Sequence, residues 1–253
     1  MKIVVTGASS GIGAATAEAF AGAGHQVALV ARRADRLAEV ASRCGASAST
    51  WVADLGELDA LSALADAIDS ELDGIDVLVN NAGIPKRKRV LSMTGDDLEE
   101  VLRVNFRSPA QLTLAFLPRL IERGSGHVVN VSSMGVHSAA FGVGAYAASK
   151  AALELFTESL HLELAKTGVR AHLFVPGTTK SEFSNDKPGN EPSTWRPADA
   201  TTPEEVAASL VACLDDPRFR TFATRREETT CRTKEADPEA FIATARDRLA
   251  ALL

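Results

Sequence analysis

The sequence predicts one α/β domain built on a doubly wound parallel β-sheet, and three observations support this prediction. Short runs of β-branched residues alternate along the chain with alanine-rich stretches of helical length, which is the pattern of βαβ units. The runs are continuously apolar, as parallel strands buried on both faces should be. The chain has 253 residues, 45% of them hydrophobic, which suits a single domain over 1–253 with a large aliphatic core.

Each expected element follows from its residues. The expected strands are the apolar runs Lys2–Thr6, Gln26–Ala31, Ala48–Val52, 76–80, Gly126–Val131 and Val169–Val175. The expected helices are the alanine-rich stretches at about 11–23, 34–43, 57–71, 96–123 and 144–167. Thr94 is placed to cap the fourth helix, and Pro109 to kink or divide it.

The composition changes beyond Lys180. Residues 181–203 contain four prolines and few aliphatic residues, which favours a loop that covers the substrate site, here called the lid. We expect a helix at 202–215, a last strand at 218–224 and a terminal helix at 238–253. The chain thus divides into a core over 1–180, the lid, and a C-terminal segment over 204–253.

Charge and cysteine content exclude several classes of function. The net charge is −6, so no basic excess exists to neutralise nucleic-acid phosphates or to bind an anionic membrane surface. The chain shows no signal-peptide pattern and no apolar run of 18 residues, so we expect a cytoplasmic protein. Its three cysteines lack C-x-x-C spacing, which predicts reduced thiols and no metal site.

A glycine-rich loop follows the first strand. It reads Thr6-Gly7-Ala8-Ser9-Ser10-Gly11-Ile12-Gly13. Three glycines permit a tight turn and a close backbone approach to a pyrophosphate, and the next helix offers unpaired N–H groups to the anion. A tight turn without a ligand is the alternative, but a position at the first βα junction favours a nucleotide site.

A tyrosine and a lysine four residues apart suggest acid–base chemistry. Tyr146, the only tyrosine, and Lys150 would lie on one face of a helix. The lysine ammonium would favour phenolate and lower the tyrosine pKa toward the range of general acid–base catalysis. Ser133 lies thirteen residues upstream, after a buried strand. An amphipathic helix with a solvated lysine is the alternative for the pair alone.

These motifs occur in one order and at characteristic separations, and together they resemble the short-chain dehydrogenase/reductase family. The resemblance covers about residues 1–180 and implies a Rossmann-type fold. It depends on the glycine-rich loop, Asn80-Asn81-Ala82-Gly83, Asn105, Ser133, Tyr146 with Lys150, and Pro176-Gly177.

The resemblance implies four catalytic residues. Tyr146 would be the general acid for carbonyl reduction or the base for alcohol oxidation, with its pKa lowered by Lys150. Lys150 would also bind the nicotinamide ribose. Ser133, in preference to Ser132, would hold the substrate oxygen, and Asn105 would anchor a water relay, although a residue at that point of a helix is more often a surface or bend residue.

The resemblance also implies a set of cofactor-binding residues. Asp54 would bind the adenine amino group, although it could equally cap the next helix, and the backbone after Pro176 would face the nicotinamide carboxamide. The full implied set is Gly7, Ser9, Ser10, Gly11, Ile12, Gly13, Arg32, Arg33, Asp54, Leu55, Asn81, Ala82, Gly83, Tyr146, Lys150, Pro176, Gly177 and Thr178.

The end of the second strand indicates which nicotinamide cofactor binds. An acid there would accept hydrogen bonds from the ribose 2′-hydroxyl and repel a 2′-phosphate, whereas an arginine would bind the phosphate. Ala31 stands where the acid would be, and Arg32 and Arg33 follow. The prediction is NADP(H), with Arg32 as the main partner of the phosphate. Two solvated arginines are the alternative.

Two charged stretches and one histidine have no predicted role. Lys86-Arg87-Lys88-Arg89 is interpreted as a solvated loop in preference to a binding site for an anionic substrate, and His137 as a loop residue. Arg225-Arg226-Glu227-Glu228 is interpreted as surface. The C-terminal segment does not resemble the glycine-containing final strand found in many family members, which leaves a homodimer or a homotetramer open.

The predicted function is transfer of hydride between NADP(H) and a carbonyl/alcohol pair of a small-molecule substrate. The alternatives are an NAD-dependent alcohol dehydrogenase and a non-catalytic regulator that senses NADP(H). The presence of Asn105, Ser133, Tyr146 and Lys150 together argues against a sensor, which has no need of all four. The substrate itself depends on loop geometry that a sequence does not provide.

Overall fold

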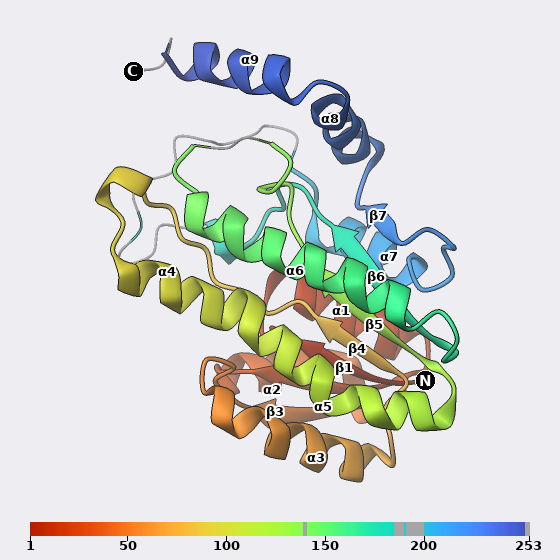
Figure 1. Ribbon diagram of the computed structural model, residues 1–253. Coiled ribbons are helices and arrows are strands. Elements are labelled where there is room, and N and C mark those ends of the chain that lie inside the picture. The colour runs from red at the N-terminus through yellow and green to blue at the C-terminus, as the bar shows by residue number, and fades with distance from the viewer. Residues whose placement is uncertain (139–140, 185–189, 191–199, 251–253) are drawn as a thin grey trace.

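The computed structural model describes residues 1–138, 141–184, 190 and 200–250, and within these ranges its strands form a single parallel sheet (Figure 1). The spatial order is β3-β2-β1-β4-β5-β6-β7. This order reverses between β1 and β4, where ligands bind in open α/β sheets. The strands are β1 (Lys2–Thr6), β2 (Gln26–Ala31), β3 (Ala48–Val52), β4 (Val77–Asn80), β5 (Gly126–Val131), β6 (Val169–Val175) and β7 (Arg220–Phe222).

Helices cover both faces of the sheet. One face carries α1 (Gly11–Gly22), α2 (Ala34–Cys44) and α7 (Pro203–Ala212), and the other carries α3 (Leu61–Leu72), α5 (Ser108–Arg123) and α6 (Gly144–Glu163). The helix α4 (Gly95–Leu102) precedes α5, and α8 (Arg225–Ala236) and α9 (Pro238–Ala250) follow β7. No helix in the described part of the chain is both long and apolar enough to span a membrane.

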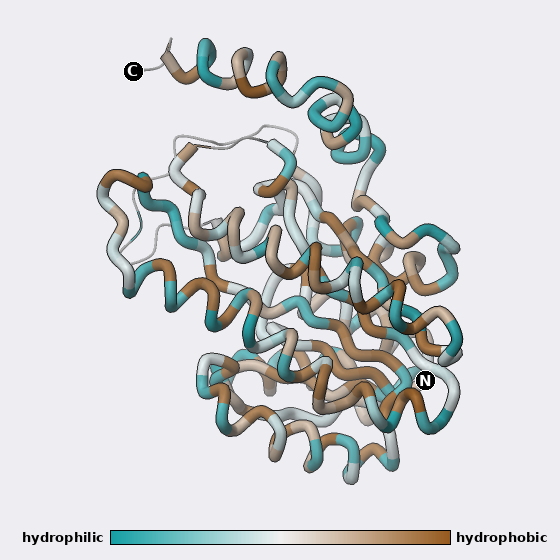
Figure 2. Tube along the Cα trace, viewed as in Figure 1, coloured by the Kyte–Doolittle hydropathy of each residue, from teal (hydrophilic) through white to brown (hydrophobic). Residues whose placement is uncertain are grey.

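Strand side chains alternate between two hydrophobic cores. Ile3 and Val5 of β1 pack with α1, α2 and α7, whereas Val4 between them packs with α3, α5 and α6. The apolar strands between the helix layers are visible in Figure 2. Because β1, β2, β4 and β6 are almost wholly buried, continuous apolar runs were the correct signal for the centre of this sheet, whereas the edge strand β3 is partly exposed. The predicted parallel α/β fold is confirmed.

The predicted fourth helix is in fact two helices. A π-helical turn, Arg103–Arg107, separates α4 from α5, and Asn105 lies at its centre. Pro109, the residue expected to kink or divide the helix, follows this turn directly and lies in the first turn of α5. Thr94 caps α4 as predicted, and its hydroxyl accepts a hydrogen bond from the Asp97 N–H at 3.2 Å.

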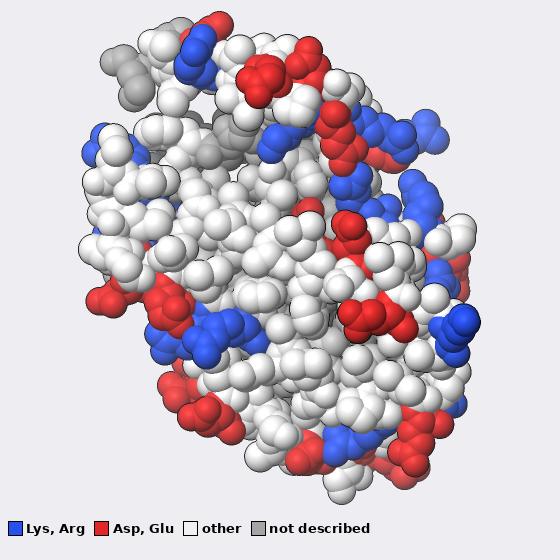
Figure 3. All heavy atoms as spheres, viewed as in Figure 1, with Lys and Arg blue, Asp and Glu red and all other residues white. Residues whose placement is uncertain are grey.

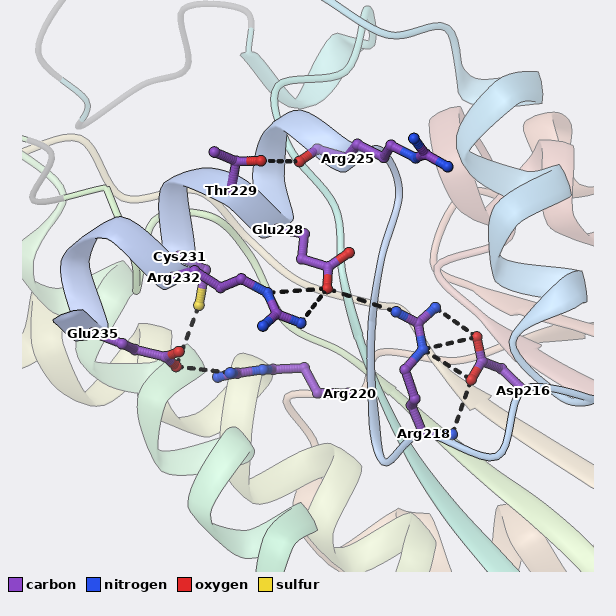
Figure 4. A network of polar contacts seen from close by, with 9 residues as sticks. All are labelled: Asp216, Arg218, Arg220, Arg225, Glu228, Thr229, Cys231, Arg232 and Glu235. Atoms are coloured by element: carbon purple, nitrogen blue, oxygen red, sulfur yellow. Dashed lines mark hydrogen bonds and ion pairs between the residues drawn. The ribbon is translucent and has the colours of Figure 1, made fainter.

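The stretch 225–228, interpreted from the sequence as surface, is the first turn of α8, and Glu227 within it is buried. Ion pairs attach α8 to the segment around β7 (Figure 4). Arg220 Nη2 donates to Glu235 Oε1 at 2.7 Å, and Glu228 lies between Arg218 and Arg232. In contrast, none of the described residues of α9 is buried, and this helix extends away from the sheet (Figure 1).

Candidate active site

The loop between β1 and α1 has the backbone of an anion-binding site. Gly7 and Gly11 have φ values of 68° and 56°, in the left-handed region that disfavours other residues. A Cβ atom on Gly13 would overlap the carbonyl oxygen of Gly7. Ser10 precedes α1 but makes no side-chain cap, and the first turn carries no acid. The first N–H groups of α1 therefore lack the side-chain acceptors that cap α4 and α7.

The segment after β4 is fastened to β1. Thr6 Oγ1 accepts hydrogen bonds from the backbone N–H groups of Asn81 and Ala82, both at 3.0 Å, and the Asn81 side chain donates to the Thr6 carbonyl at 2.9 Å. A Cβ on Gly7 would lie 2.8 Å from Ala82 Cα. Only a glycine at position 7 allows this close approach of the two strand ends.

Asn105 is held in the core of the site by the π-helical turn. Its Oδ1 accepts from the Ile84 N–H at 2.8 Å, and its Nδ2 donates to the Ile84 carbonyl and to Ser149 Oγ, both at 3.1 Å. The side chain is fully buried. Asn105 thus joins the segment after β4 to α6, and it is neither a surface residue nor a simple bend. The extra residue of a π turn is often found at functional sites.

Tyr146, Ser133 and Lys150 meet at the carboxyl end of β5. The Ser133 and Tyr146 side chains are hydrogen bonded to each other, and Ser133 Oγ also accepts from the Gly135 N–H at 3.0 Å. Lys150 is buried, and its Nζ donates to the Val131 carbonyl at 2.8 Å. One turn of α6 separates Tyr146 from Lys150, so both project from one helix face.

The pKa of the tyrosine differs from the expectation. Burial raises the pKa of Tyr146, and the hydrogen bond to Ser133 opposes this rise only in part. Burial also lowers the pKa of Lys150 to about 8, against the nearby Glu154 carboxylate, which raises it. Lys150 does not reverse the effect of burial on the phenol, since its ammonium is directed at the Val131 carbonyl. At neutral pH the phenol is protonated and the ammonium is charged.

A polar chain that the sequence did not reveal supports this end of the site. Glu154, on α6, accepts hydrogen bonds from Ser132 and lies 3.1 Å from His137 Nε2. The other His137 nitrogen lies 3.4 Å from Cys231 Sγ of α8. His137 is therefore a buried link between two helices, and not the role-free loop residue that was expected.

This Cys–His–Glu series does not form a nucleophile. Burial raises the pKa of Cys231 to about 11, so the reactive thiolate is scarce at neutral pH. The thiol is also fully buried. All three cysteines are unbridged, in agreement with the prediction.

The two arginines after β2 point to different places. Arg33 Nη2 donates to Ser10 Oγ at 2.8 Å and to Ser9 Oγ at 3.1 Å, beside the start of α1. Arg32 instead lies 3.6 Å from Asp54, whose carboxylate accepts from the Gly56 N–H at 2.8 Å. Asp54 thus closes a turn and does not cap a helix. Of the two arginines, Arg33 is the one beside the glycine-rich loop.

The segment after β6 approaches the predicted catalytic residues. The Pro176 carbonyl accepts from the Met134 N–H at 3.0 Å, next to Ser133. A Cβ on Gly177 would overlap the carboxylate of Glu227, so α8 packs directly on this segment. The Thr178 carbonyl accepts from the Thr201 N–H at 3.0 Å, which ties the segment to the chain two residues before α7.

The basic run after β4 is solvated only in part, since Arg89 is exposed whereas Lys86 is not. Lys86 is buried, and its Nζ lies 2.8 Å from Glu100 and 3.1 Å from Asp97. Lys88 Nζ lies 2.6 Å from the other Asp97 oxygen. These contacts attach the loop to α4. They also hold the pKa of Asp97 well below its usual range, through hydrogen bonds from Lys88, the Thr94 backbone and Lys86.

The structure also places two further predicted cofactor-binding residues, but only part of the predicted lid. Leu55 is buried in the segment between β3 and α3, and Ile12, in the first turn of α1, packs against the core. Most of the predicted lid, residues 185–189 and 191–199, lies outside the described residues. Of the lid, the structure describes residues 181–184, 190 and 200–203.

Comparison with known proteins identifies the family. Residues 1–192 match the family model described as short chain dehydrogenase. An uncharacterized oxidoreductase of Mycobacterium tuberculosis is 41% identical over 177 residues, which are 66% of this chain and 52% of the relative. The chain therefore spans about half the length of this relative. The chain belongs to the short-chain dehydrogenase family.

Solved structures agree with this assignment. A short-chain dehydrogenase from Streptomyces avermitilis has a TM-score of 0.84 at 30% identity, with 99% of this chain and 97% of that chain covered. One from Sphingobium yanoikuyae, in complex with NADPH, has a TM-score of 0.81 at 27% identity, covering 100% and 96%. One from Burkholderia phymatum, in complex with NAD, shares the fold with a TM-score of 0.84 at 24% identity, covering 94% of each chain.

Proposed function

We propose that this oxidoreductase moves hydride between NADP(H) and a carbonyl/alcohol pair, with Tyr146 as the general acid or base. The observation that carries the proposal is the hydrogen bond between the Tyr146 and Ser133 side chains, close to the buried ammonium of Lys150. Arg33, bonded to the hydroxyls of Ser9 and Ser10, supports the choice of NADP(H).

The residues fit a dinucleotide. The uncapped start of α1 and the left-handed glycines suit the pyrophosphate, and Arg33 with Ser9 and Ser10 suits a 2′-phosphate. The remaining candidates are Asp54 and Leu55 for the adenosine, and Asn81, Ala82, Gly83, Lys150, Pro176, Gly177 and Thr178 for the nicotinamide side. Bound NADPH would supply the hydride, and the protein's own groups would supply orientation and the proton.

Tyr146 and Ser133 would hold the substrate oxygen between two hydroxyl donors and stabilise the negative charge that develops there. Tyr146 would then give its proton to that oxygen. The raised pKa keeps the phenol protonated at neutral pH, which favours reduction as the working direction. The charged Lys150 favours the phenolate that remains after the transfer. Asn105 would fix the position of α6 through its hydrogen bond to Ser149. It is also the proposed anchor of a water relay.

The direct test is a screen of aldehydes, ketones, sugars and steroids with NADPH oxidation as the readout, run in parallel with NADH. We expect turnover with NADPH that Tyr146→Phe abolishes. Turnover that prefers NADH would instead favour an NAD-dependent alcohol dehydrogenase. Tight NADPH binding without turnover of any substrate would favour a non-catalytic NADP(H)-sensing regulator.

We also propose a cytoplasmic homodimer or homotetramer. Leu114 of α5 and Leu155 and Leu162 of α6 are exposed by 59%, 69% and 68%. The surface over these helices is largely uncharged (Figure 3), which suits contact with a second copy of this chain. Light scattering coupled to size exclusion tests this proposal. Leu155→Glu should then lower the mass to that of a smaller species, and an unchanged mass would place the interface elsewhere.

A further inference from the structure

Three consecutive residues after β6 contact both the glycine-rich loop and Tyr146. We call residues 181–183 the strap. Ser181 packs on the glycine-rich loop, since a Cβ on Gly11 would lie 3.2 Å from Ser181 Cβ. The Phe183 ring lies 5.8 Å from the ring of Tyr146. The strap therefore contacts the anion-binding loop at one end and the catalytic tyrosine at the other.

Glu182, in the middle of the strap, is bound by the arginine that we assign to the cofactor. Its Oε2 accepts from Arg33 Nη1 at 2.8 Å, and its Oε1 lies 3.8 Å from Arg36 Nη2. The same Arg33 guanidinium donates to the hydroxyls of Ser9 and Ser10. A carboxylate and a phosphate make the same charge-assisted contacts with a guanidinium. Glu182 thus takes donors that a 2′-phosphate would use.

We propose that Glu182 is an internal competitor for the 2′-phosphate and thereby sets how strongly the enzyme prefers NADP(H) over NAD(H). This inference rests on the proposed role of Arg33. A cofactor with a 2′-phosphate must displace the Glu182 carboxylate from Arg33 and meets its negative charge. A cofactor without that phosphate does neither, and its ribose hydroxyls are potential hydrogen-bond donors to the carboxylate.

The exposure of the pair sets the size of the effect. The side chains of Arg33 and Glu182 are 44% and 47% exposed. Exposed ion pairs contribute little, so removal of Glu182 should tighten binding of a 2′-phosphate only about 2- to 5-fold. Glu182 therefore tunes a preference that Arg33 creates.

The test measures binding of nucleotide fragments to the full chain by calorimetry, without catalysis. The probes are 2′,5′-ADP, which carries the 2′-phosphate, and 5′-AMP, which lacks it. Glu182→Gln should tighten 2′,5′-ADP about 2- to 5-fold and leave 5′-AMP within about 1.5-fold. Glu39→Gln is the matched control, because the Glu39 carboxylate pairs with Arg36 at 3.2 Å. It should change the 2′,5′-ADP affinity less than Glu182→Gln does.

A double-mutant cycle separates the effect of the Glu182–Arg33 ion pair from the general effect of removing a negative charge. In an Arg33→Ala background, Glu182→Gln should tighten 2′,5′-ADP clearly less than in the wild type, since only the charge of Glu182 and its longer contact with Arg36 remain. An equal gain in this background, or unchanged 2′,5′-ADP binding by Glu182→Gln alone, overturns the inference. If the wild type binds 2′,5′-ADP no tighter than 5′-AMP but Glu182→Gln gains that preference, the NADP(H) assignment fails and the role of Glu182 stands.

Discussion

The two ends of the proposed site are built in different ways. At the catalytic end, Asn105, Ser149 and Lys150 are buried, and their side chains are held by short hydrogen bonds. At the phosphate end, Arg33 and Glu182 are almost half exposed and held by ion pairs. Buried hydrogen-bonded groups are fixed before a ligand arrives, whereas exposed ion pairs exchange partners at little cost. The chemistry should therefore be sensitive to single substitutions, and the choice of cofactor should be adjustable.

The most severe way to test the catalytic end is to remove the phenol oxygen. Tyr146→Phe should lower kcat by about 10³-fold or more, equivalent to roughly 4 kcal/mol of barrier, because the phenol is the group that we propose to give the proton. The fold and the NADPH dissociation constant should stay close to the wild type. Stopped-flow hydride transfer and fluorescence titration measure the two quantities. Near-normal turnover would rule out Tyr146 as the proton donor.

The corresponding change at the phosphate end is Arg33→Ala. It should raise the NADPH KM about 10- to 100-fold, the size of one charge-assisted pair, and leave the NADH KM nearly unchanged. Arg32→Ala is the matched control, because Arg32 lies beside Asp54 and away from Ser9 and Ser10. Its effect on the NADPH KM should be smaller. A larger effect of Arg32→Ala would return the phosphate to the arginine that the sequence favoured.

Reversal of cofactor preference extends that test. Adding Ala31→Asp to Arg33→Ala should make the enzyme prefer NADH, because the new carboxylate repels a 2′-phosphate and accepts hydrogen bonds from ribose hydroxyls. The ratio of kcat/KM for the two cofactors reports the change. A ratio that does not respond to either substitution would mean that the residues after β2 do not select the cofactor.

The polar chain behind the catalytic end should be visible in the pH profile. Glu154 raises the pKa of Lys150, which burial lowers to about 8. Glu154→Gln removes the negative charge, so the pKa of Lys150 falls further and the ammonium is lost at lower pH. Reductase activity should then decline at a lower pH than in the wild type, while activity at pH 6.5 stays within about threefold. If the loss of activity at alkaline pH occurred at the same pH in both proteins, the ionisation of Lys150 would not be its cause.

A buried histidine pair far from the site should respond to pH through stability alone. His127 Nδ1 and His172 Nε2 lie 3.0 Å apart, and burial lowers the pKa of His172 to about 3. Between pH 6.5 and that value, the unfolded chain binds a proton that the folded chain does not, so stability falls as pH falls. From pH 7 to 5 this loss is about 1–2 kcal/mol.

His172→Gln should remove this loss, so that its unfolding free energy falls less steeply with acid than that of the wild type. Urea unfolding at both pH values measures the difference. Equal pH dependence in the two proteins would show that His172 titrates normally. Turnover at neutral pH should be unchanged by the substitution, in contrast to substitutions at the catalytic end.

Most of the sheet, and the meeting of Ser133, Tyr146 and Lys150 at one strand end, could be predicted because their signals are local. Continuous apolar runs marked the parallel strands, and the spacing of Ser133, Tyr146 and Lys150 reflected one strand end and one helix turn. The carboxyl end of a parallel sheet then brings distant motifs together. Glu154 could have been found in the same way, since it lies one turn beyond Lys150 on α6.

The rest depends on tertiary contacts that no local pattern reports. The helix α8 is rich in charges of both signs, and its position comes from Glu227 against Gly177 and from Cys231 against His137. Arg32 and Arg33 are neighbours in the sequence, yet they point to different partners. The approach of Glu182 to Arg33 joins positions 149 residues apart. None of these side-chain contacts can be predicted from composition or periodicity.

One measurement tests the account most directly: kcat and the NADPH and NADH dissociation constants for the wild type, Tyr146→Phe and Arg33→Ala, obtained on one carbonyl substrate. The account predicts a loss of kcat of about 10³-fold with unchanged cofactor binding for Tyr146→Phe. It predicts about 10-fold or more weaker NADPH binding, with kcat and NADH binding within about twofold, for Arg33→Ala. If Tyr146→Phe turned over like the wild type, or if each substitution impaired both ends equally, the division of labour proposed here would be contradicted.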